Sequence, residues 1–182
     1  MTIQKLIIAG FGGQGVMLIG ELIAYAAMLE GKEVTWMPAY GPEMRGGTAN
    51  CSVVVSSRPI ASPVVDEPTA VVVMNTPSLE KFEELLVPGG ELFINSSLIR
   101  RKAVRSDVHV NYIDCNEIAI RSQTDKAANM VMLGAILSRT NVASPASAET
   151  AMKALFSGKK AAMIPSNMKA LSAWKDLAKS SA

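Results

Sequence analysis

The sequence is poor in the residues that most often carry catalysis or span membranes. Its 182 residues include two cysteines, one histidine and only 5% aromatic residues. Two cysteines cannot supply the four thiolates of an iron–sulfur cluster, and one histidine allows at most one Ser-His-Asp triad. No apolar run approaches the ~18 residues of a membrane-spanning helix. We therefore expect no catalytic residue, no metal site and no membrane contact in this chain.

An excess of charge of either sign is also missing. Lys and Arg number 18, and Asp and Glu number 16, which gives a net charge of +2 at pH 7. This balance gives no reason to expect nucleic acid as a partner. The N-terminus lacks the features of a signal peptide, and Cys51 and Cys115 lack CxxC spacing. We therefore expect a cytoplasmic protein with free thiols.

Apolar residues, by contrast, are plentiful at 49% of the chain. They can fill the core of a single domain, which we place over residues 1–182. We expect Cys51 to be a small buried residue, and Met130 and Met132 to fill the core or an interface. Cys115 follows Asp114 near a strand end and could be more exposed.

Strand-like and helix-like segments alternate along the chain. Strands are predicted over 6–9, 33–37, 48–56, 70–75, 91–95 and 108–113, and helices over 16–30, 76–86, 125–139, 145–157 and 165–179. The first strand, first helix and second strand form a βαβ unit, which Pro38 ends. About ten residues separate the second and third strands, too few for a helical crossover, so an antiparallel pair is expected. The pattern predicts an α/β fold, a three-layer α/β/α Rossmann-like domain with a mixed sheet.

A glycine-rich loop follows the first strand. Gly10, Gly12 and Gly15 satisfy the pattern G-x-G-x-x-G, in which free amides at a helix start favour an anion. We name Gly12, Gly13, Gln14 and Gly15 as cofactor-binding candidates. No acidic residue ends the second strand, so the ribose contact of a complete dinucleotide site is missing. A turn that merely packs the helix against the strand remains the simpler alternative.

A second unusual loop runs from Tyr40 to Gly47. It combines one proline, three glycines, Glu43 and Arg45, and it is too short for a helix. Arg45 could hold a phosphate or carboxylate with two hydrogen bonds, while the Gly46 and Gly47 backbone approaches the ligand closely. A solvated loop in which Glu43 pairs with Arg45 is the alternative.

Two further sets of residues are candidates for a functional role. His109 alternates with Val108 and Val110 in a strand, which favours a structural or surface role over that of a general base. Asp125 and Asn129 are one helical turn apart near a predicted helix start. They could position a partner's loop, or Asp125 could simply cap the helix.

The two loops together resemble the gamma subunit of 2-oxoacid:ferredoxin oxidoreductases of the 2-oxoglutarate or 2-oxoisovalerate type. The similarity covers residues 3–140, and it is carried by 10–16, 40–47, 50–52, Asp66, Met74-Asn75 and 129–135. The order of the two loops is specific to that group. The C-terminal helices add little.

This resemblance implies a non-catalytic subunit of a complex that decarboxylates a 2-oxoacid oxidatively, makes the acyl-coenzyme A and reduces ferredoxin. It implies thiamine diphosphate and magnesium in alpha and beta subunits, and iron–sulfur clusters in the beta subunit or a ferredoxin-like delta subunit, within a heterotetramer. This chain would help coenzyme A binding and assembly, and it would hold no cofactor alone.

Three other interpretations stay open. One is a stand-alone nucleotide-binding protein of Rossmann type. Another is the beta subunit of an indolepyruvate oxidoreductase, which shares the fold and has similar glycine loops. The third is an architectural subunit whose loops touch only protein.

Overall fold

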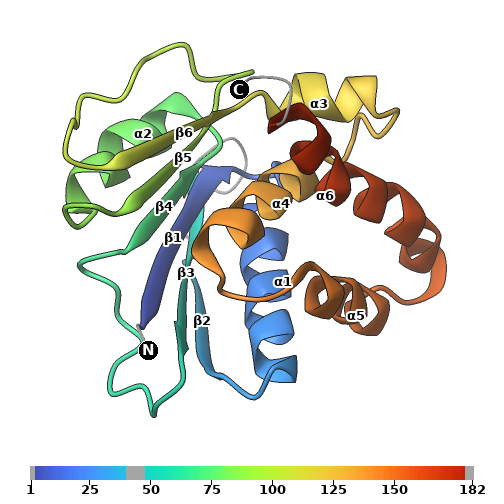
Figure 1. The fold of residues 1–182 in the computed structure, drawn as a ribbon, viewed down its shortest axis with the longest axis horizontal. Coiled ribbons are helices and arrows are strands. Elements are labelled where there is room, and N and C mark those ends of the chain that lie inside the picture. The colour runs from blue at the N-terminus through green and yellow to red at the C-terminus, as the bar shows by residue number, and fades with distance from the viewer. Residues whose placement is uncertain (1–2, 40–47, 179–182) are drawn as a thin grey trace.

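A six-stranded sheet forms the centre of the protein in the computed structural model, which describes residues 3–39 and 48–178. The strands are β1 (Gln4–Phe11), β2 (Glu33–Ala39), β3 (Thr48–Ser56), β4 (Ala70–Val73), β5 (Glu91–Asn95) and β6 (His109–Ile113). Their order across the sheet is β2-β3-β1-β4-β5-β6. Figure 1 shows this sheet with helices packed on both sides.

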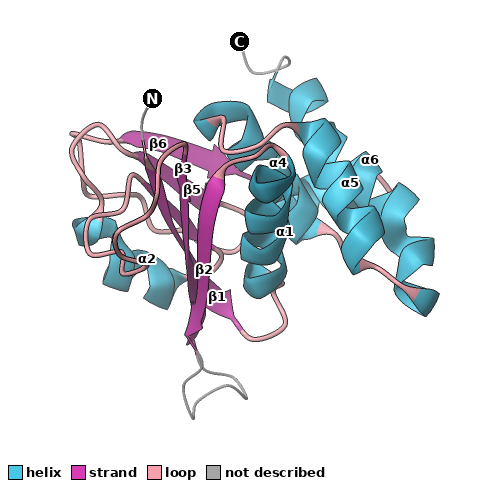
Figure 2. Cartoon of the chain, turned by 90° about the horizontal axis from the view of Figure 1, so that it is seen from below, coloured by secondary structure: helices cyan, strands magenta, loops and turns pink. Residues whose placement is uncertain are grey.

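The helices are distributed unequally over the two faces of the sheet. They are α1 (Val16–Leu29), α2 (Thr76–Phe82), α3 (Cys115–Arg121), α4 (Ala128–Thr140), α5 (Pro145–Leu155) and α6 (Ile164–Ala178), with 3₁₀ turns at Glu83–Leu85 and Gly158–Met163. Figure 2 shows α2 on one face, α1 and α4 against the other, and α5 and α6 further out. The predicted three-layer α/β/α fold is confirmed. None of the described helices is long and apolar enough to cross a membrane.

The sheet is mixed, as predicted, because β3 runs antiparallel to both of its neighbours. β1, β4, β5 and β6 are parallel to one another. The expected βαβ unit is wrong in one respect, since β3 lies between β1 and β2 and pairs with both. The short connection to β3 returns the chain between the first two strands.

The prediction that Pro38 ends the second strand is also wrong. β2 continues through Pro38 to Ala39, with Pro38 opposite Cys51 on β3. β2 is the outermost strand on its side. An edge strand tolerates proline because one side of its backbone needs no partner strand.

Helix boundaries were predicted less well than strands. α4 begins at Ala128, not Asp125, and its N-cap is Ala127 without a side-chain hydrogen bond. Asp125 therefore does not cap the helix. The short helix α3 was missed, because its seven residues show only about two turns of periodicity. Its residue Cys115 is fully buried, which contradicts the expected exposure.

Two glycines allow close contacts, one between the helical layer and the sheet and one within the helical layer. Gly20 of α1 lies over Cys51 and Trp36, where an added Cβ would lie 2.5 Å from the Cys51 sulfur. Gly134 of α4 lies against the backbone carbonyl of Leu171 on α6, closely enough that a Cβ would overlap that oxygen. Met130 and Met132 are buried in the same core, as predicted.

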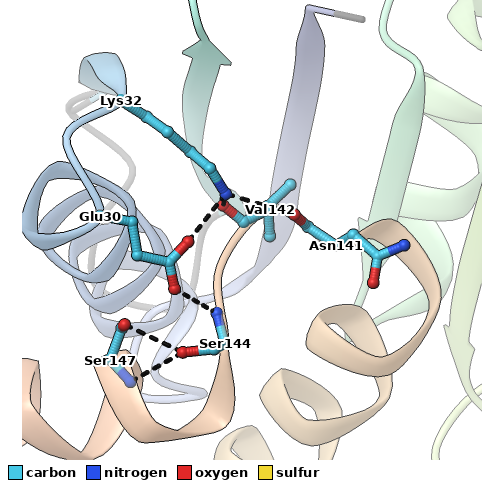
Figure 3. Close-up of polar contacts among 6 residues, drawn as sticks. All are labelled: Glu30, Lys32, Asn141, Val142, Ser144 and Ser147. Carbon is cyan, nitrogen blue, oxygen red and sulfur yellow. Dashed lines mark hydrogen bonds and ion pairs between the residues drawn. The ribbon is translucent and has the colours of Figure 1, made fainter. Parts of the chain in front are cut away.

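A charged cluster joins the end of α1 to the connection between α4 and α5, as Figure 3 shows. Lys32 donates to Glu30 at 2.9 Å and to the Val142 carbonyl at 2.8 Å. The other Glu30 oxygen accepts the backbone N–H of Ser144 at 2.7 Å. Ser144 in turn caps α5 by accepting the Ser147 N–H. The hydrogen bonds of Lys32 and Glu30 to this connection thus tie together segments more than 100 residues apart.

This cluster makes the stability of the fold depend on pH in the acid range. Partial burial raises the pKa of Glu30, but the hydrogen bonds from Lys32, the Ser144 backbone and the two serine hydroxyls outweigh it and lower the pKa to about 2. The ordinary value is 4.5. The ionised carboxylate therefore stabilises the fold fully above pH 4.5, and this stabilisation disappears as the pH falls towards 2.

We expect Glu30→Gln to lower the free energy of unfolding by roughly 1–3 kcal/mol at pH 7 and by clearly less at pH 3. Urea denaturation at both pH values measures the difference. Glu149→Gln is the control, because Glu149 pairs with Lys153 on the exposed surface of α5 and should cost under about 0.5 kcal/mol. Equal costs for the two variants at pH 7 would contradict this role of Glu30.

Candidate functional site

The glycine loop lies where the helices change from one face of the sheet to the other. α1 follows β1 and packs on the larger core, whereas α2 follows β4 and packs on the smaller core of the opposite face. β1 and β4 are parallel neighbours. Their connections therefore diverge at the carboxyl edge of the sheet, where open α/β sheets bind ligands.

Gln14 holds the loop closed and ties it to β4. Its side-chain oxygen accepts the Phe11 N–H at 2.6 Å, and its side-chain nitrogen donates to the Met74 carbonyl at 3.0 Å. The Gln14 backbone N–H also donates to the Phe11 carbonyl. The predicted donor and acceptor of Gln14 are thus both present, and both are used within the protein.

Two glycines of this loop have backbone conformations that favour glycine. Gly13 has φ of 92° and Gly15 has φ of 76°. Gly15 is the N-cap residue of α1, and no side chain caps the amides of that first turn. Gly12 and Gly13 are exposed. The loop therefore presents backbone amides at a helix N-terminus, which is the geometry that favours an anion.

Asn129 covers the start of α1 from the side of α4. A Cβ added at Gly15 would overlap the Asn129 amide and would lie 2.9 Å from its Cγ. Asn129 lies in the first turn of α4, and Asp125 lies in the turn before it. The predicted pair is close to the glycine loop, although the two residues do not share a helical face.

A hollow of about 240 Å³ opens beside the loop. It is lined by Gly13, Gln14, Gly15, Met74, Asn95, Leu98, Asn116, Asp125, Lys126, Ala128 and Asn129. Asn95, at the carboxyl end of β5, is fully buried, and its side-chain nitrogen donates to Asn116 at 3.0 Å. Its side-chain oxygen has no partner among the described residues. A buried polar atom without a partner is costly, so Asn95 marks this hollow as polar at its base.

Sequence reasoning missed Asn95, Asn116 and Lys126. Asn95 ends a predicted strand, and polar residues at the carboxyl ends of parallel strands were the signal that could have found it. Asn116 and Lys126 lie in the missed helix α3 and in the turn before α4. Their positions depended on boundaries that the periodicity did not resolve.

The second loop lies outside the described residues, and so do the candidates Arg45, Gly46 and Gly47. The flanking residues are Ala39, opposite Asn50, and Thr48, opposite Phe11 at the carboxyl end of β1. These positions lie at the same edge of the sheet as the glycine loop. That the two loops meet over one ligand stays a prediction.

The two thiols lie in the core. Burial raises the pKa of the Cys51 thiol to about 11. Burial, together with the nearby charge of Asp114, raises the pKa of Cys115 further. Both are therefore protonated at neutral pH. His109 is exposed on the edge strand β6, in agreement with a surface role.

No group of three or more His, Cys, Asp or Glu residues is placed to hold a metal ion within 3–39 and 48–178. The hollow at the carboxyl edge is lined by side-chain amides, the glycine-loop backbone, the lysine Lys126 and the carboxylate Asp125. These groups can bind and orient an anionic molecule, and they offer little acid–base chemistry.

We expect Gly15→Ala to destabilise the protein by at least ~1 kcal/mol more than Gly31→Ala or Gly13→Ala, because it adds a steric overlap to the same backbone strain. Gly31 and Gly13 also have positive φ, but an added Cβ at either would meet nothing within 4 Å. Urea denaturation of the three variants measures the difference.

Removing the Asn129 side chain should recover part of the Gly15→Ala loss. The double variant Gly15→Ala with Asn129→Ala vacates the space that the new methyl group needs. If the three glycine variants lose the same stability, the close contact between Gly15 and Asn129 has no energetic role.

Comparison with known proteins places this geometry in a family. The sequence profile described as pyruvate ferredoxin/flavodoxin oxidoreductase matches residues 5–174. The ketoisovalerate oxidoreductase subunit VorA of Methanothermobacter marburgensis is 38% identical over 173 residues, which cover 94% of this chain and 36% of that protein. The 2-oxoglutarate synthase subunit KorC of Methanocaldococcus jannaschii is 34% identical over 152 residues, which cover 82% of this chain and 81% of KorC.

A solved structure agrees with these relatives. The keto/oxoacid ferredoxin oxidoreductase gamma subunit from Geobacter sulfurreducens superposes with a TM-score of 0.81 at 26% identity, over 97% of this chain and 99% of that subunit. The chain spans about a third of the length of the VorA proteins that it matches. It matches KorC and the Geobacter subunit over most of their length. The chain therefore belongs to the pyruvate ferredoxin/flavodoxin oxidoreductase family, and the resemblance to its gamma subunits that the sequence predicted is confirmed.

Proposed function

We propose that this chain is the gamma-type subunit of a 2-oxoacid:ferredoxin oxidoreductase complex and that residues 1–182 form its single domain. The match to the gamma subunit and to KorC over most of their lengths carries this proposal. The complex would convert a 2-oxoacid, coenzyme A and an oxidised acceptor into acyl-coenzyme A, carbon dioxide and the reduced acceptor. We place the complex in the cytoplasm.

We take 2-oxoglutarate as the substrate, because the KorC relatives are named for 2-oxoglutarate synthase and match over most of their own length. A branched 2-oxoacid such as ketoisovalerate is the second candidate. It is favoured by the higher identity to the VorA subunits, which is 38% and 43%.

Partner subunits would supply the chemistry. Thiamine diphosphate and magnesium would be held by alpha and beta subunits, and iron–sulfur clusters by the beta subunit or a ferredoxin-like delta subunit, in a heterotetramer. The two cysteines here are buried in different elements, β3 and α3, and both keep their protons. They are poor candidates for cluster ligands, which must be thiolates.

The role of this chain would be to help bind coenzyme A and to complete the assembly. Gly12, Gly13 and Gly15 would present backbone amides to a phosphate group, and Gln14 would keep the loop in shape. Arg45, with the Gly46 and Gly47 backbone, would contact coenzyme A or the adjoining subunit. The position of the glycine loop at the switch between β1 and β4 supports this role.

A stand-alone dinucleotide-binding protein fits the observed sheet less well. In the usual arrangement a parallel strand next to the first one carries an acidic residue for the ribose. Here the neighbour of β1 on that side is the antiparallel β3. The beta subunit of an indolepyruvate oxidoreductase has a similar fold. That alternative differs from our proposal in the substrate of the complex, which would be indolepyruvate.

The proposal is tested by reconstitution. The catalytic subunits encoded with this chain are produced with and without it, and reduction of a viologen dye is followed with each 2-oxoacid. We expect full activity only with this chain present, with coenzyme A, and with 2-oxoglutarate as the best substrate. Equal activity without the chain, or a requirement for indolepyruvate, would contradict the proposal.

We expect Arg45→Ala to raise the KM for coenzyme A about 10-fold or more, since a charge-assisted contact to a phosphate is worth ~1.5–3 kcal/mol. The KM for the 2-oxoacid should stay unchanged. Arg58→Ala, at an arginine outside the two loops, is the control. If Arg45→Ala weakens assembly and leaves the KM for coenzyme A alone, the loop contacts only protein.

A further inference from the structure

The hairpin formed by α5, the second 3₁₀ turn and α6 carries charge of one sign. Residues 150–175 include five lysines and no Asp or Glu, although the whole chain is nearly balanced. Lys153 pairs with Glu149 along α5. Lys159 and Lys160, at the tip of the hairpin, are exposed and form no ion pair with a carboxylate of the described residues. The tip therefore carries positive charge that its own chain does not neutralise.

This tip is exposed along its whole length. Gly158–Met163 forms six residues of 3₁₀ helix without one buried residue. Runs of 3₁₀ helix longer than about four residues are uncommon. Figure 2 shows α5 and α6 as the helices furthest from the sheet. Packing within this chain thus gives the tip little reason for its shape, and its side chains are open to a partner.

An apolar hollow of about 180 Å³ opens beside the tip. Leu18, Met130 and Phe156 form its apolar lining, and of these Met130 is fully buried and Phe156 is 8% exposed. Met163 also lines it and is 46% exposed, so it lies at the edge. The volume is below the ~300 Å³ of most small-molecule sites. It suits a single apolar side chain inserted by a partner, the usual anchor of a protein interface.

Two lysines flank this hollow. Lys160 comes from the tip and Lys126 from the turn before α4, and both are exposed. Lys160 and Met163 are three residues apart in the 3₁₀ helix, so their side chains lie on the same side of it. Asn129 and Asn167 complete the lining. An apolar hollow with cations at its edge is complementary to an apolar side chain flanked by carboxylates.

Neighbouring elements oppose these cations only weakly. Asp125 lies beside Lys126 in the turn before α4. On α3, which packs on α6, Glu117 and Arg121 are both exposed and have opposite charges. On α1, which packs on α5, Glu21 is half-buried. The described cations of this surface therefore outnumber its carboxylates.

The composition of the hairpin favours a protein over other anionic partners. Residues 150–175 contain no arginine, the residue whose planar fork suits phosphate. Their aromatic residues are Phe156, which is buried, and Trp174, which is half-buried, so neither is free to stack on a nucleic-acid base. The apolar residues of the tip are two alanines and one methionine, whereas membrane-surface helices rely on Trp, Phe and Leu.

We propose that this hollow and the lysines beside it form a docking site for an acidic segment of another protein chain. The segment carries one apolar side chain between Asp or Glu residues. That side chain fills the hollow against Phe156, and the carboxylates pair with Lys126 and Lys160. A neighbouring subunit of the proposed complex would supply the segment, so the identity of the partner rests on the proposed function.

Zero-length cross-linking of the native complex tests the contact without altering the chain. A carbodiimide joins lysine amines to carboxylates that touch them. Mass spectrometry should then find Lys126, Lys159 or Lys160 joined to an Asp or Glu of another subunit, next to an apolar residue in the sequence of that subunit. Absence of such links, with all three lysines as open to acetylation in the complex as in the free chain, would overturn the proposal.

Charge reversal measures the electrostatic part of the contact. Lys159→Glu with Lys160→Glu should weaken association with the catalytic subunits about tenfold or more at ~50 mM NaCl, and clearly less at ~500 mM. Arg100→Glu with Lys102→Glu makes the same charge change in the connection between β5 and β6. All four residues are exposed, and circular dichroism checks folding. Equal effects of the two pairs would show that only bulk charge matters, and would overturn the site.

The apolar part is tested at the edge of the hollow. Met163→Asp places a carboxylate there and should weaken association about tenfold or more. Val64→Asp is the control, because Val64 is 53% exposed in the connection between β3 and β4, and it should have little effect. Unchanged association of the Met163 variant would overturn the role of the hollow.

Binding to lipid is a separate outcome. Vesicles that contain phosphatidylserine are mixed with the free chain and with the variant that carries Lys159→Glu and Lys160→Glu. We expect no binding of either. Vesicle binding that needs the two lysines, with no cross-link to another chain, would assign the surface to a membrane and overturn the protein partner.

These outcomes separate the docking site from the proposed function. If dye reduction depends on this chain and yet the charge-reversed tip and the Met163 variant assemble normally, the docking site is wrong and the function stands. If the cross-links from the tip lead to a protein that is no part of an oxidoreductase complex, the docking site stands and the function is wrong.

Discussion

The short path from β1 to α1 is the constraint on which the rest of this structure depends. At Gly10 an added Cβ would lie 2.7 Å from the Gln14 side-chain oxygen and 2.9 Å from the Met74 Cβ. The strand, the helix and β4 can meet this closely only because that position has no side chain. The hydrogen bonds of Gln14 to Phe11 and to the Met74 carbonyl then fix the loop against β4.

This constraint positions the start of α1, and the other helices of that layer are arranged around it. Asn129 on α4 lies directly over Gly15, and Gly134 brings α6 into backbone contact with α4 one turn further on. At the opposite end of α1, the ion pair of Glu30 and Lys32 holds the turn that leads from α4 to α5. The helical layer is therefore held at both ends of α1, and the N-termini of α1 and α4 lie together at the carboxyl edge of the sheet.

The same arrangement explains why this chain would work as a subunit. Backbone amides and asparagine amides can bind and orient an anionic cofactor, but they supply no nucleophile, acid or metal site of their own. Such a surface becomes useful when a neighbouring subunit carries the reacting atoms. In the proposed complex this chain would hold one part of coenzyme A while thiamine chemistry takes place in its partners.

Local pattern was enough for most strands and for the family, but not for contacts between distant segments. β3 and β5 were predicted with their observed bounds, because short apolar runs between turn residues are a local signal. The passage of β2 through Pro38 was missed, since edge position is a property of the whole sheet. The burial of Cys115 and the start of α4 at Ala128 depend on packing between elements, which periodicity does not contain.

The candidate site shows the same difference between local signals and contacts over long sequence distances. Gly13 and Gly15 were found from their spacing, and their positive φ values agree with it. Asn95 was not found, because what singles it out is a buried side-chain oxygen without a partner. Gly15 and Asn129 are separated by 114 positions in the sequence (from 15 to 129), and only the tertiary structure brings them into contact.

Purification of the native complex from its source, followed by intact mass spectrometry, tests the account most directly. We expect this chain to co-purify in a fixed ratio with thiamine-binding subunits and a ferredoxin-like subunit, in a fraction that reduces dye when a 2-oxoacid and coenzyme A are both present. A solitary chain that carries a bound nucleotide and lacks such partners would contradict the account.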